Sequence, residues 1–276
     1  MVGSMTSAKP TIANDIDYHV HSNLSVDAYD SVEVMCERAV DIGLTEIVFA
    51  EHYDTEPADE GYGFYDYEKS REAVERMQNR FGDRLTVKLG IEVDYQTIFQ
   101  AQIAEFLAGK RYDYVLGARH WEQGALIGDD YFEGRTEDEA YGRYFETVLP
   151  LVESGLFDVL AHIDLVKRDG TERYGTFDVE KWMPYIEPIL QKLVQRGMGL
   201  EINTSGVRQP PREPYPGLAI IKRYRELGGG ILTVGSDSHR VAQLGVGLET
   251  GIRLAKDAGF TGLTLFDGRK PVVIPL

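Results

Sequence analysis

The residues with the clearest chemical potential lie near the N-terminus, where His19 and His21 are separated by one residue and Asp27 follows. Side chains two positions apart on a strand lie on the same face, so an extended segment over residues 15–21 would aim both imidazoles at one point. Two imidazoles with a carboxylate nearby are ligands typical of a divalent transition metal. A His-x-His pair by itself is more often a surface or packed pair, so the remaining histidines decide the interpretation.

All the histidines of the chain lie at the end of a predicted strand or just after one: His19, His21, His52, His120, His162 and His239. Three carboxylates follow the same rule. Asp27 comes after the first strand, Glu92 is near the end of the third, and Asp237 precedes His239 by two residues. These nitrogen and oxygen ligands exceed what one ion takes, since zinc usually takes about four and octahedral metals about six. The pattern therefore predicts two or three divalent ions, with Glu92 or a solvent species as a bridge.

The order of predicted elements indicates an α/β fold with a parallel sheet. The expected strands cover residues 16–20, 45–50, 85–93, 112–117, 157–161, 198–202 and 231–234. The expected helices cover residues 32–42, 68–81, 97–108, 136–153, 179–196, 218–227 and part of 245–258. Prolines at 184 and 188 predict a kink or a split in the fifth helix, and residues 263–275 are expected to form an extended tail. Polar loops are expected over residues 53–67 and 122–135.

A closed barrel and an open doubly wound sheet both fit this alternation. The open sheet is disfavoured because no Gly-rich phosphate-binding fingerprint follows the first strand. A barrel is favoured because its active groups sit at the C-terminal ends of several strands, where the chemically interesting residues of this chain fall. We expect one domain over residues 15–276, preceded by a tail over residues 1–14 whose first four residues resemble a cloning remnant.

Composition excludes several classes of protein. The formal net charge of −16 argues against binding to nucleic acid or to anionic lipid. No apolar run approaches the roughly 18 residues needed to span a membrane, and the N-terminus lacks the apolar segment of a signal peptide, so a cytoplasmic location is expected. The one cysteine, Cys36, allows no intrachain disulfide and is interpreted as a small core residue.

Six short motifs together resemble the PHP (polymerase and histidinol phosphatase) family, and the resemblance extends from Asp17 to Asp267. The motifs are His19-x-His21 with Asp27, Glu51-His52, Gly90-Ile91-Glu92, Gly117-Ala118-Arg119-His120, Ala161-His162-Ile163-Asp164-Leu165 and Gly235-Ser236-Asp237-Ser238-His239. The resemblance implies a distorted (β/α)7 TIM-like barrel with up to three metal ions, for which zinc, manganese and iron are equally suitable.

The resemblance also implies how the ligands divide. One ion would be held by His19, His21, Glu92 and Asp237. A second would be held by Glu92, His120 and His162. A third would be held by Asp27, His52 and His239. Glu51 would orient one of the ligand histidines.

A second group of motifs resembles the histidinol-phosphatase branch of the family. It consists of Glu201 to Arg208 with Tyr215-Pro216, and it implies that Asn203, Ser205 and Arg208 line the substrate pocket. Arg119 departs from the family pattern, because small residues are usual before the histidine that follows it.

The implied reaction is hydrolysis of a small phosphomonoester, most simply L-histidinol phosphate. The hypothesis is in-line attack by a metal-bridging hydroxide, with Asp237, His239 and Asp164 as catalytic residues. Asp164 or a metal-bound water would protonate the leaving group. Arg208, then Arg119 and Arg168, are the candidates for contacts to phosphate.

Three other functions remain open at this stage. The same chemistry could serve a sugar phosphate or a nucleotide, because the sequence says little about the pocket loops. A nuclease is disfavoured by the net charge, and a non-catalytic metal-binding barrel is disfavoured by the complete ligand set. Oligomeric state cannot be derived from the sequence.

Overall fold

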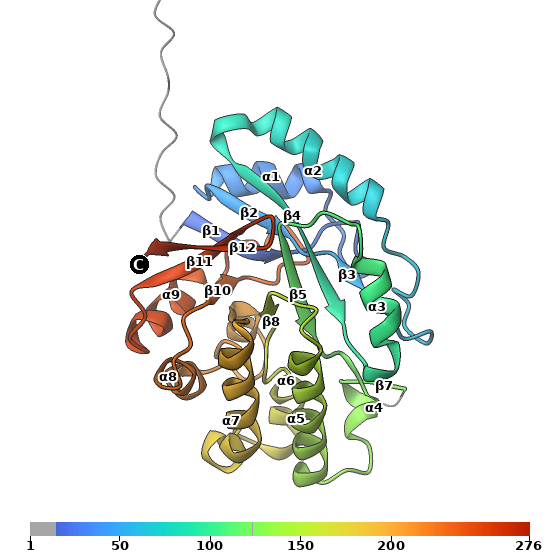
Figure 1. The fold of residues 1–276 in the computed structure, drawn as a ribbon, viewed down its shortest axis with the longest axis vertical. Coiled ribbons are helices and arrows are strands. Elements are labelled where there is room, and N and C mark those ends of the chain that lie inside the picture. Colours follow the sequence, from blue (N-terminus) through green and yellow to red (C-terminus); the bar gives the residue numbers. More distant parts are fainter. Residues whose placement is uncertain (1–14, 123) are drawn as a thin grey trace, which may run out of the picture.

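A parallel sheet forms the centre of the molecule, and helices surround it (Figure 1). This computed structural model describes residues 15–122 and 124–276, so the predicted tail over residues 1–14 lies outside it. The strands follow one another in the order β1-β2-β4-β5-β8-β9-β10, and the short β3 pairs with β4. The central strands are β1 (Ile16–Val20), β2 (Glu46–Phe49), β3 (His52–Tyr53), β4 (Thr86–Asp94), β5 (Tyr114–Ala118), β8 (Val159–Leu160), β9 (Gly199–Asn203) and β10 (Leu232–Gly235).

The sheet curves until its last strand lies beside its first. Val20 and Ser238 form a parallel bridge, and the His21 N–H donates to the Ser238 carbonyl at 2.9 Å. The Asp237 N–H donates to the carbonyl of His19 at 2.7 Å. The ring is therefore nearly closed, and the predicted distorted seven-stranded barrel is confirmed.

The helices that connect the strands cover the outside of the barrel. They are α1 (Val32–Asp41), α2 (Tyr67–Phe81), α3 (Gln100–Leu107), α4 (Asp129–Phe132), α5 (Glu137–Ser154), α6 (Lys167–Tyr174), α7 (Val179–Arg196), α8 (Leu218–Glu226) and α9 (Leu248–Asp257). Helix α1 shows why such segments are helical: Ser31 caps its first turn, and Met35 and Cys36 lie on its buried face. The interpretation of Cys36 as a core residue is confirmed.

Helix α7 was expected to kink or split at its prolines, but it runs as one helix over the whole predicted range. Pro184 and Pro188 lie on its exposed face, where the carbonyl groups that lose hydrogen bonds can bind water. The opposite face buries Trp182 and Ile186 and packs against α5. Packing of the apolar face therefore keeps the helix continuous.

Three segments differ from their predictions. The polar loop over 122–135 contains the hairpin of β6 (Trp121–Glu122) and β7 (Ala125–Leu126) as well as α4, and α6 had no predicted counterpart. The C-terminal segment is an antiparallel hairpin of β11 (Gly262–Asp267) and β12 (Lys270–Pro275) rather than an extended tail. Its residues contact the N-terminal ends of the central strands, through Leu232 and Asp113 among others. The hairpin thus covers the end of the barrel opposite the histidines.

The Tyr18 hydroxyl ties this hairpin to the barrel, since it donates to Glu46 and accepts from the Phe266 N–H at 3.0 Å. We expect Tyr18→Phe to lower the free energy of unfolding by about 1–3 kcal/mol, because it removes the acceptor of the buried Phe266 N–H and the hydroxyl donor of the buried Glu46, which keeps only Lys88 at 3.7 Å. Urea unfolding measures the change. Tyr29→Phe is the matched control, because Tyr29 is 70% exposed. Equal stability of both variants would contradict the prediction.

Candidate active site

The C-terminal ends of the barrel strands bring the predicted ligands into one buried cluster. His19 lies in β1 and His21 directly follows it, so the alternation of the extended backbone turns both rings inward, and both are 0% exposed. Glu92 in β4 is 1% exposed and lies between them and the later histidines. His162 and Asp237 follow β8 and β10 with positive φ angles of 20° and 51°, so the backbone turns sharply where these side chains enter the cluster.

The first predicted ligand set is assembled around the ends of β1 and β10. The Nε2 atoms of His19 and His21 lie 3.3 and 3.7 Å from Glu92 Oε2. The same nitrogens lie 3.9 and 3.4 Å from Asp237 Oδ1. Four ligand atoms from three strands therefore surround one point.

The second set uses the other oxygen of the same carboxylate. Glu92 Oε1 lies 2.7 Å from His162 Nε2 and 3.6 Å from His120 Nε2. Because Oε1 faces this set and Oε2 faces the first, Glu92 has the geometry of a bridging ligand.

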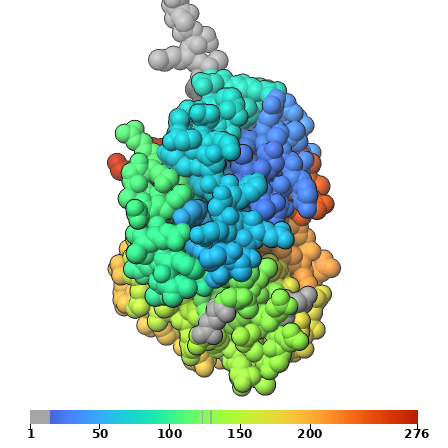
Figure 2. Space-filling model, turned by 90° about the vertical axis from the view of Figure 1, so that its right-hand side faces the viewer, coloured from blue at the N-terminus to red at the C-terminus, as the bar shows by residue number. Residues whose placement is uncertain are grey.

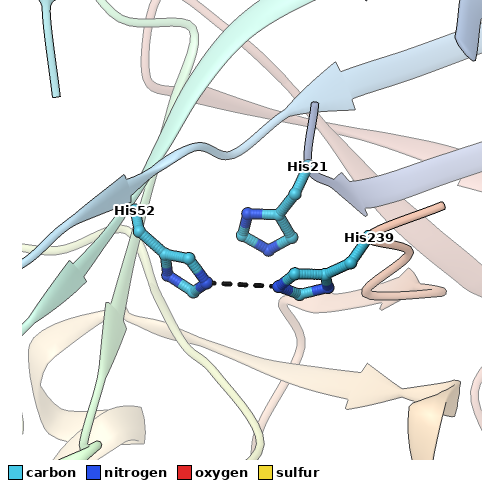
Figure 3. Close-up of side chains that lie close together, drawn as sticks. All are labelled: His21, His52 and His239. Carbon is cyan, nitrogen blue, oxygen red and sulfur yellow. Dashed lines mark hydrogen bonds between the residues drawn. The ribbon is translucent and has the colours of Figure 1, made fainter. Parts of the chain in front are cut away.

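The third set lies nearest the solvent. The His239 and His52 Nε2 atoms are 3.3 Å apart and lie 3.1 and 3.6 Å from Asp27 Oδ2. Figure 3 shows the rings of His52 and His239 pointing toward each other, with His21 beside them. The Asp27 side chain is 52% exposed, so this set opens to the mouth of the barrel.

Hydrogen bonds from the rest of the chain select the tautomers of three ligand histidines. His19 Nδ1 lies 2.6 Å from Glu201 Oε1, and His239 Nδ1 lies 3.2 Å from the Asp237 carbonyl. His21 Nδ1 lies 3.3 Å from the hydroxyl of Ser25, whose own proton goes to Glu51. In each case Nδ1 carries the proton, which leaves the lone pair on Nε2, the atom that faces the cluster.

Burial and charge act against each other within the cluster. Burial lowers the pKa of both His21 and His120 to about 3, which favours the neutral ring that binds metals. Burial raises the pKa of Glu92, but the surrounding histidines hold it well below its usual range. Burial also opposes charge on His19, yet Glu201, Glu92 and Asp237 raise its pKa well above its ordinary value. The carboxylates therefore require positive charge in their midst.

A pocket of about 830 Å³ opens from the cluster to the solvent. Arg168 and Arg208 are among its lining residues, and so are Asp54, Asp59 and Glu60. Its size is typical of a small-molecule site.

Comparison with known proteins agrees with this geometry. The family model described as the PHP domain matches residues 17–205. The chain belongs to the PHP domain family.

Curated PHP domain relatives match almost the full length of the chain. A histidinol-phosphatase of Lactococcus lactis is 28% identical over 259 residues, which are 92% of this chain and 95% of that protein. A probable histidinol-phosphatase of Thermotoga maritima is 28% identical over 261 residues, 95% of this chain and 99% of the relative. The crystal structure of the Lactococcus lactis histidinol phosphate phosphatase, complexed with zinc, L-histidinol and phosphate, superimposes with a TM-score of 0.86 at 25% identity, covering 94% of this chain and 99% of that one.

The cluster of this PHP domain fits divalent metals on two observations. Ligand atoms at about 2.0–2.1 Å from a tetrahedral ion lie roughly 3.3 Å from one another, and the distances within the three sets range from 2.7 to 3.9 Å. Second, the Nε2 atoms of His19 and His21 are fully buried with no hydrogen-bond partner among the described residues. Such orphaned acceptors are expected where a metal supplies the missing partner.

The predicted substrate-binding residues divide into two groups. Arg168 and Arg208 line the pocket, and Arg208 Nη1 has no hydrogen-bond partner in the described chain. Arg119 does not line it: its guanidinium is buried against Glu122, the Tyr95 carbonyl and Thr147. The geometry therefore contradicts Arg119 as a phosphate contact and makes it a structural residue that anchors the β6–β7 hairpin.

Asn203 and Ser205 also lie behind the pocket rather than on its wall. Asn203 Nδ2 donates to Asp237 Oδ2 at 3.1 Å, and its Oδ1 accepts from the Ser205 hydroxyl at 2.6 Å. These two residues are placed to orient a ligand carboxylate instead of touching a substrate.

Asp164 is the predicted catalytic residue that the structure keeps away from the pocket. Its side chain is 0% exposed and pairs with Lys167 Nζ at 2.7 Å, and the same ammonium binds Glu213. A carboxylate enclosed in this ion pair has no path to a leaving group. Asp237 and His239, the other two residues predicted to be catalytic, line the pocket.

Glu201 was missed as a site residue, although it belongs to a motif that was recognised. It accepts from His19 Nδ1, and its second oxygen accepts from the His162 N–H at 3.0 Å. A side chain at Gly235 would collide with His19, so only glycine allows this close approach of β10 to β1. The sequence signal that could have identified Glu201 as a site residue was its position in the predicted strand that precedes the last one.

Glu51, predicted to orient a ligand histidine, reaches one through a serine. It accepts from the Ser22 N–H and from the hydroxyls of Ser22 and Ser25, and among the described residues it has no hydrogen bond or ion pair with a histidine ring. It therefore acts on His21 through Ser25.

Among the described residues, no helix is long and apolar enough to cross a bilayer.

We expect purified protein to contain more than one equivalent of zinc, manganese or iron per chain, and His52→Ala to contain about one equivalent less. The substitution should also abolish turnover and leave the far-UV circular dichroism native. Elemental analysis gives the metal content. Less than one equivalent in the wild-type protein, or full activity of the variant, would refute the assignment of these ligands.

Glu201→Gln should weaken metal binding by roughly 10- to 100-fold, because the amide cannot accept from both His19 and the His162 backbone. Titration against a chelating dye measures the affinity. Glu72→Gln is the control, since Glu72 is exposed on α2. Unchanged affinity in Glu201→Gln would show that this carboxylate does not position the ligand.

Proposed function

We propose that this PHP domain hydrolyses L-histidinol phosphate to L-histidinol and phosphate with the help of two or three divalent ions. The observation that carries the proposal is the direct connection of the buried ligand cluster to a pocket that exposes Arg168 and Arg208. The full-length similarity to histidinol-phosphatases supports this substrate over a sugar phosphate or a nucleotide.

The ions would be held by the three sets described above. His19, His21, Glu92 and Asp237 form the first set; Glu92, His120 and His162 form the second; and Asp27, His52 and His239 form the third. When bound, divalent ions lower the pKa of a water molecule toward neutrality and offset charge on the phosphoryl oxygens.

The arginines would bind the phosphoryl group. Arg208 Nη2 donates to the Asp237 carbonyl at 2.6 Å, which fixes the guanidinium of a residue that lines the pocket and leaves the buried Nη1 without an acceptor among the described residues. Arg168 is held by Asp169 and by the Ile127 carbonyl. Guanidinium groups held in this way can contact phosphoryl oxygens without a large loss of side-chain entropy.

Water in the pocket is the proton source that the geometry favours for the leaving group. The alkoxide oxygen of L-histidinol must gain a proton, and Asp164 is enclosed in its ion pair with Lys167. The pocket is open to solvent beside Asp27, so water can reach the ester oxygen.

We further propose that residues 15–276 act as one catalytic domain in the cytoplasm. A small phosphorylated metabolite would be the partner, without nucleic acid or membrane. The net charge of −16 disfavours nucleic acid and anionic membranes as partners, and the arginines of the pocket provide local positive charge for a small phosphorylated metabolite.

A phosphate-release screen over metabolite monoesters tests the proposal. L-Histidinol phosphate should give a kcat/KM at least about tenfold above sugar phosphates and nucleotides, and removal of metal by a chelator should stop the release. His52→Ala serves as the control for contaminating phosphatases. A sugar phosphate or nucleotide that is hydrolysed faster would replace the proposed substrate.

A further inference from the structure

Outside the three ligand sets, most of the charged side chains that line the pocket fall into two groups. Arg168, Arg208 and Arg240 follow β8, β9 and β10, whereas Asp54, Asp59 and Glu60 follow β3, which pairs with β4. Asp130 in α4 is a further acid on the lining. The arginines suit a phosphoryl group. A phosphate alone does not explain the acidic side.

Asp54 is the least compensated of these acids. Its side chain is 7% exposed, lines the pocket and forms no hydrogen bond among the described residues. Its oxygens are not among the fully enclosed atoms without a partner, so in the described chain only pocket solvent can hydrogen-bond this carboxylate. A cationic ligand group that displaces this solvent would give Asp54 the partner that the protein does not supply.

The local structure holds Asp54 in place without giving it a donor. Gly61 packs against its carboxylate so closely that any side chain at this position would collide with it. The Gly61 N–H is used by Asp59, which also accepts from the indole of Trp121. In Figure 2 the light-blue segment that follows β3 lies directly above the yellow-green segment around α4. The segment that carries Asp54 is therefore held by the Gly61 and Trp121 contacts of Asp59.

Asp54 lies next to the three ligand sets but is not a member of any of them. Its carboxylate has an oxygen within 4.8 Å of ring nitrogens of His52 and His120, but it makes no ion pair of 4.0 Å or less with any histidine in the described chain. The members of the three sets approach one another at 2.7 to 3.9 Å. His52 and His120 already belong to two of those sets, so the position of Asp54 suits a group bound beside the metals.

We propose that the Asp54 carboxylate binds the ammonium group of the substrate, which makes the site selective for phosphate monoesters of amino alcohols. This inference rests on the proposed function, because L-histidinol phosphate carries an ammonium group near its phosphate. The phosphoryl group faces the arginines and the cluster, and the leaving group extends toward the segment after β3. The charges of the substrate and of the pocket are then matched end to end.

The experiment compares Asp54→Asn with the wild-type enzyme on two esters: L-histidinol phosphate and the imidazolylpropyl phosphate that lacks the amino group. The substitution keeps the shape of the side chain and removes its charge. KM for L-histidinol phosphate should rise by roughly ten- to hundredfold, the effect of losing a hydrogen bond to a charged group. Its kcat, and the kcat/KM for the ester without the amine, should change by less than about threefold.

Asp83→Asn is the matched control, because Asp83 is exposed and does not line the pocket. It removes the same charge and keeps the Asp54 carboxylate, so both esters should be hydrolysed as they are by the wild-type enzyme. Metal analysis and thermal unfolding accompany each variant. An equal loss of kcat/KM on both esters would overturn the proposal, and a loss of bound metal in Asp54→Asn would make Asp54 a metal ligand instead.

Failure of the proposed function gives a different result. In that case the wild-type enzyme does not hydrolyse L-histidinol phosphate. The inference then still predicts that the enzyme prefers phosphoethanolamine to ethyl phosphate, and that Asp54→Asn removes the preference. Equal rates on these two esters would overturn the inference independently.

Discussion

The carboxylate of Glu92 is the centre on which the site depends. It is almost fully buried, and ring nitrogens of His19, His21, His52, His120 and His162 lie within 2.7 to 3.7 Å of it. A buried anion of this kind is stable only if positive charge surrounds it. Metal ions held by these histidines would meet that need and leave the rings neutral. The same interaction that stabilises the cluster therefore prepares it for chemistry on a phosphate.

Closure of the barrel is what creates this environment. Two backbone hydrogen bonds join the end of β1 to the turn after β10, and Asp17 strengthens the junction by accepting from the Ser236 N–H at 2.7 Å. The close approach requires glycine at 235 and a left-handed backbone at Asp237. Backbone strain of this kind persists where surrounding contacts determine it fully. Here it is concentrated at the residues that would hold metal.

A layer of carboxylates behind the ligands orders the site without touching the substrate. Glu201 holds His19 and the backbone of His162, and Glu51 holds the Ser22–Ser25 turn. The ion pair of Asp164 with Lys167 belongs to the same supporting structure. These residues are acidic and close to the catalytic motifs, and they are nevertheless enclosed. Proximity in the sequence to a ligand therefore does not make a residue catalytic.

The sequence by itself determined the barrel, the strand ends and the convergence of the histidines. These follow from local patterns: alternation places His19 and His21 on one face, and parallel strands present their ends at one edge. It did not determine which polar residues would face the pocket. Arg119 and Asp164 turn away from the pocket. Glu201 gains its importance from partners that are distant in the chain, and Asp54 from a place on the pocket lining where the described chain offers it no donor. Only the tertiary structure decides which polar residues face the pocket. Burial and hydrogen-bond partners depend on packing between segments that are distant in the chain, and the local sequence of one segment does not specify which other segment it packs against.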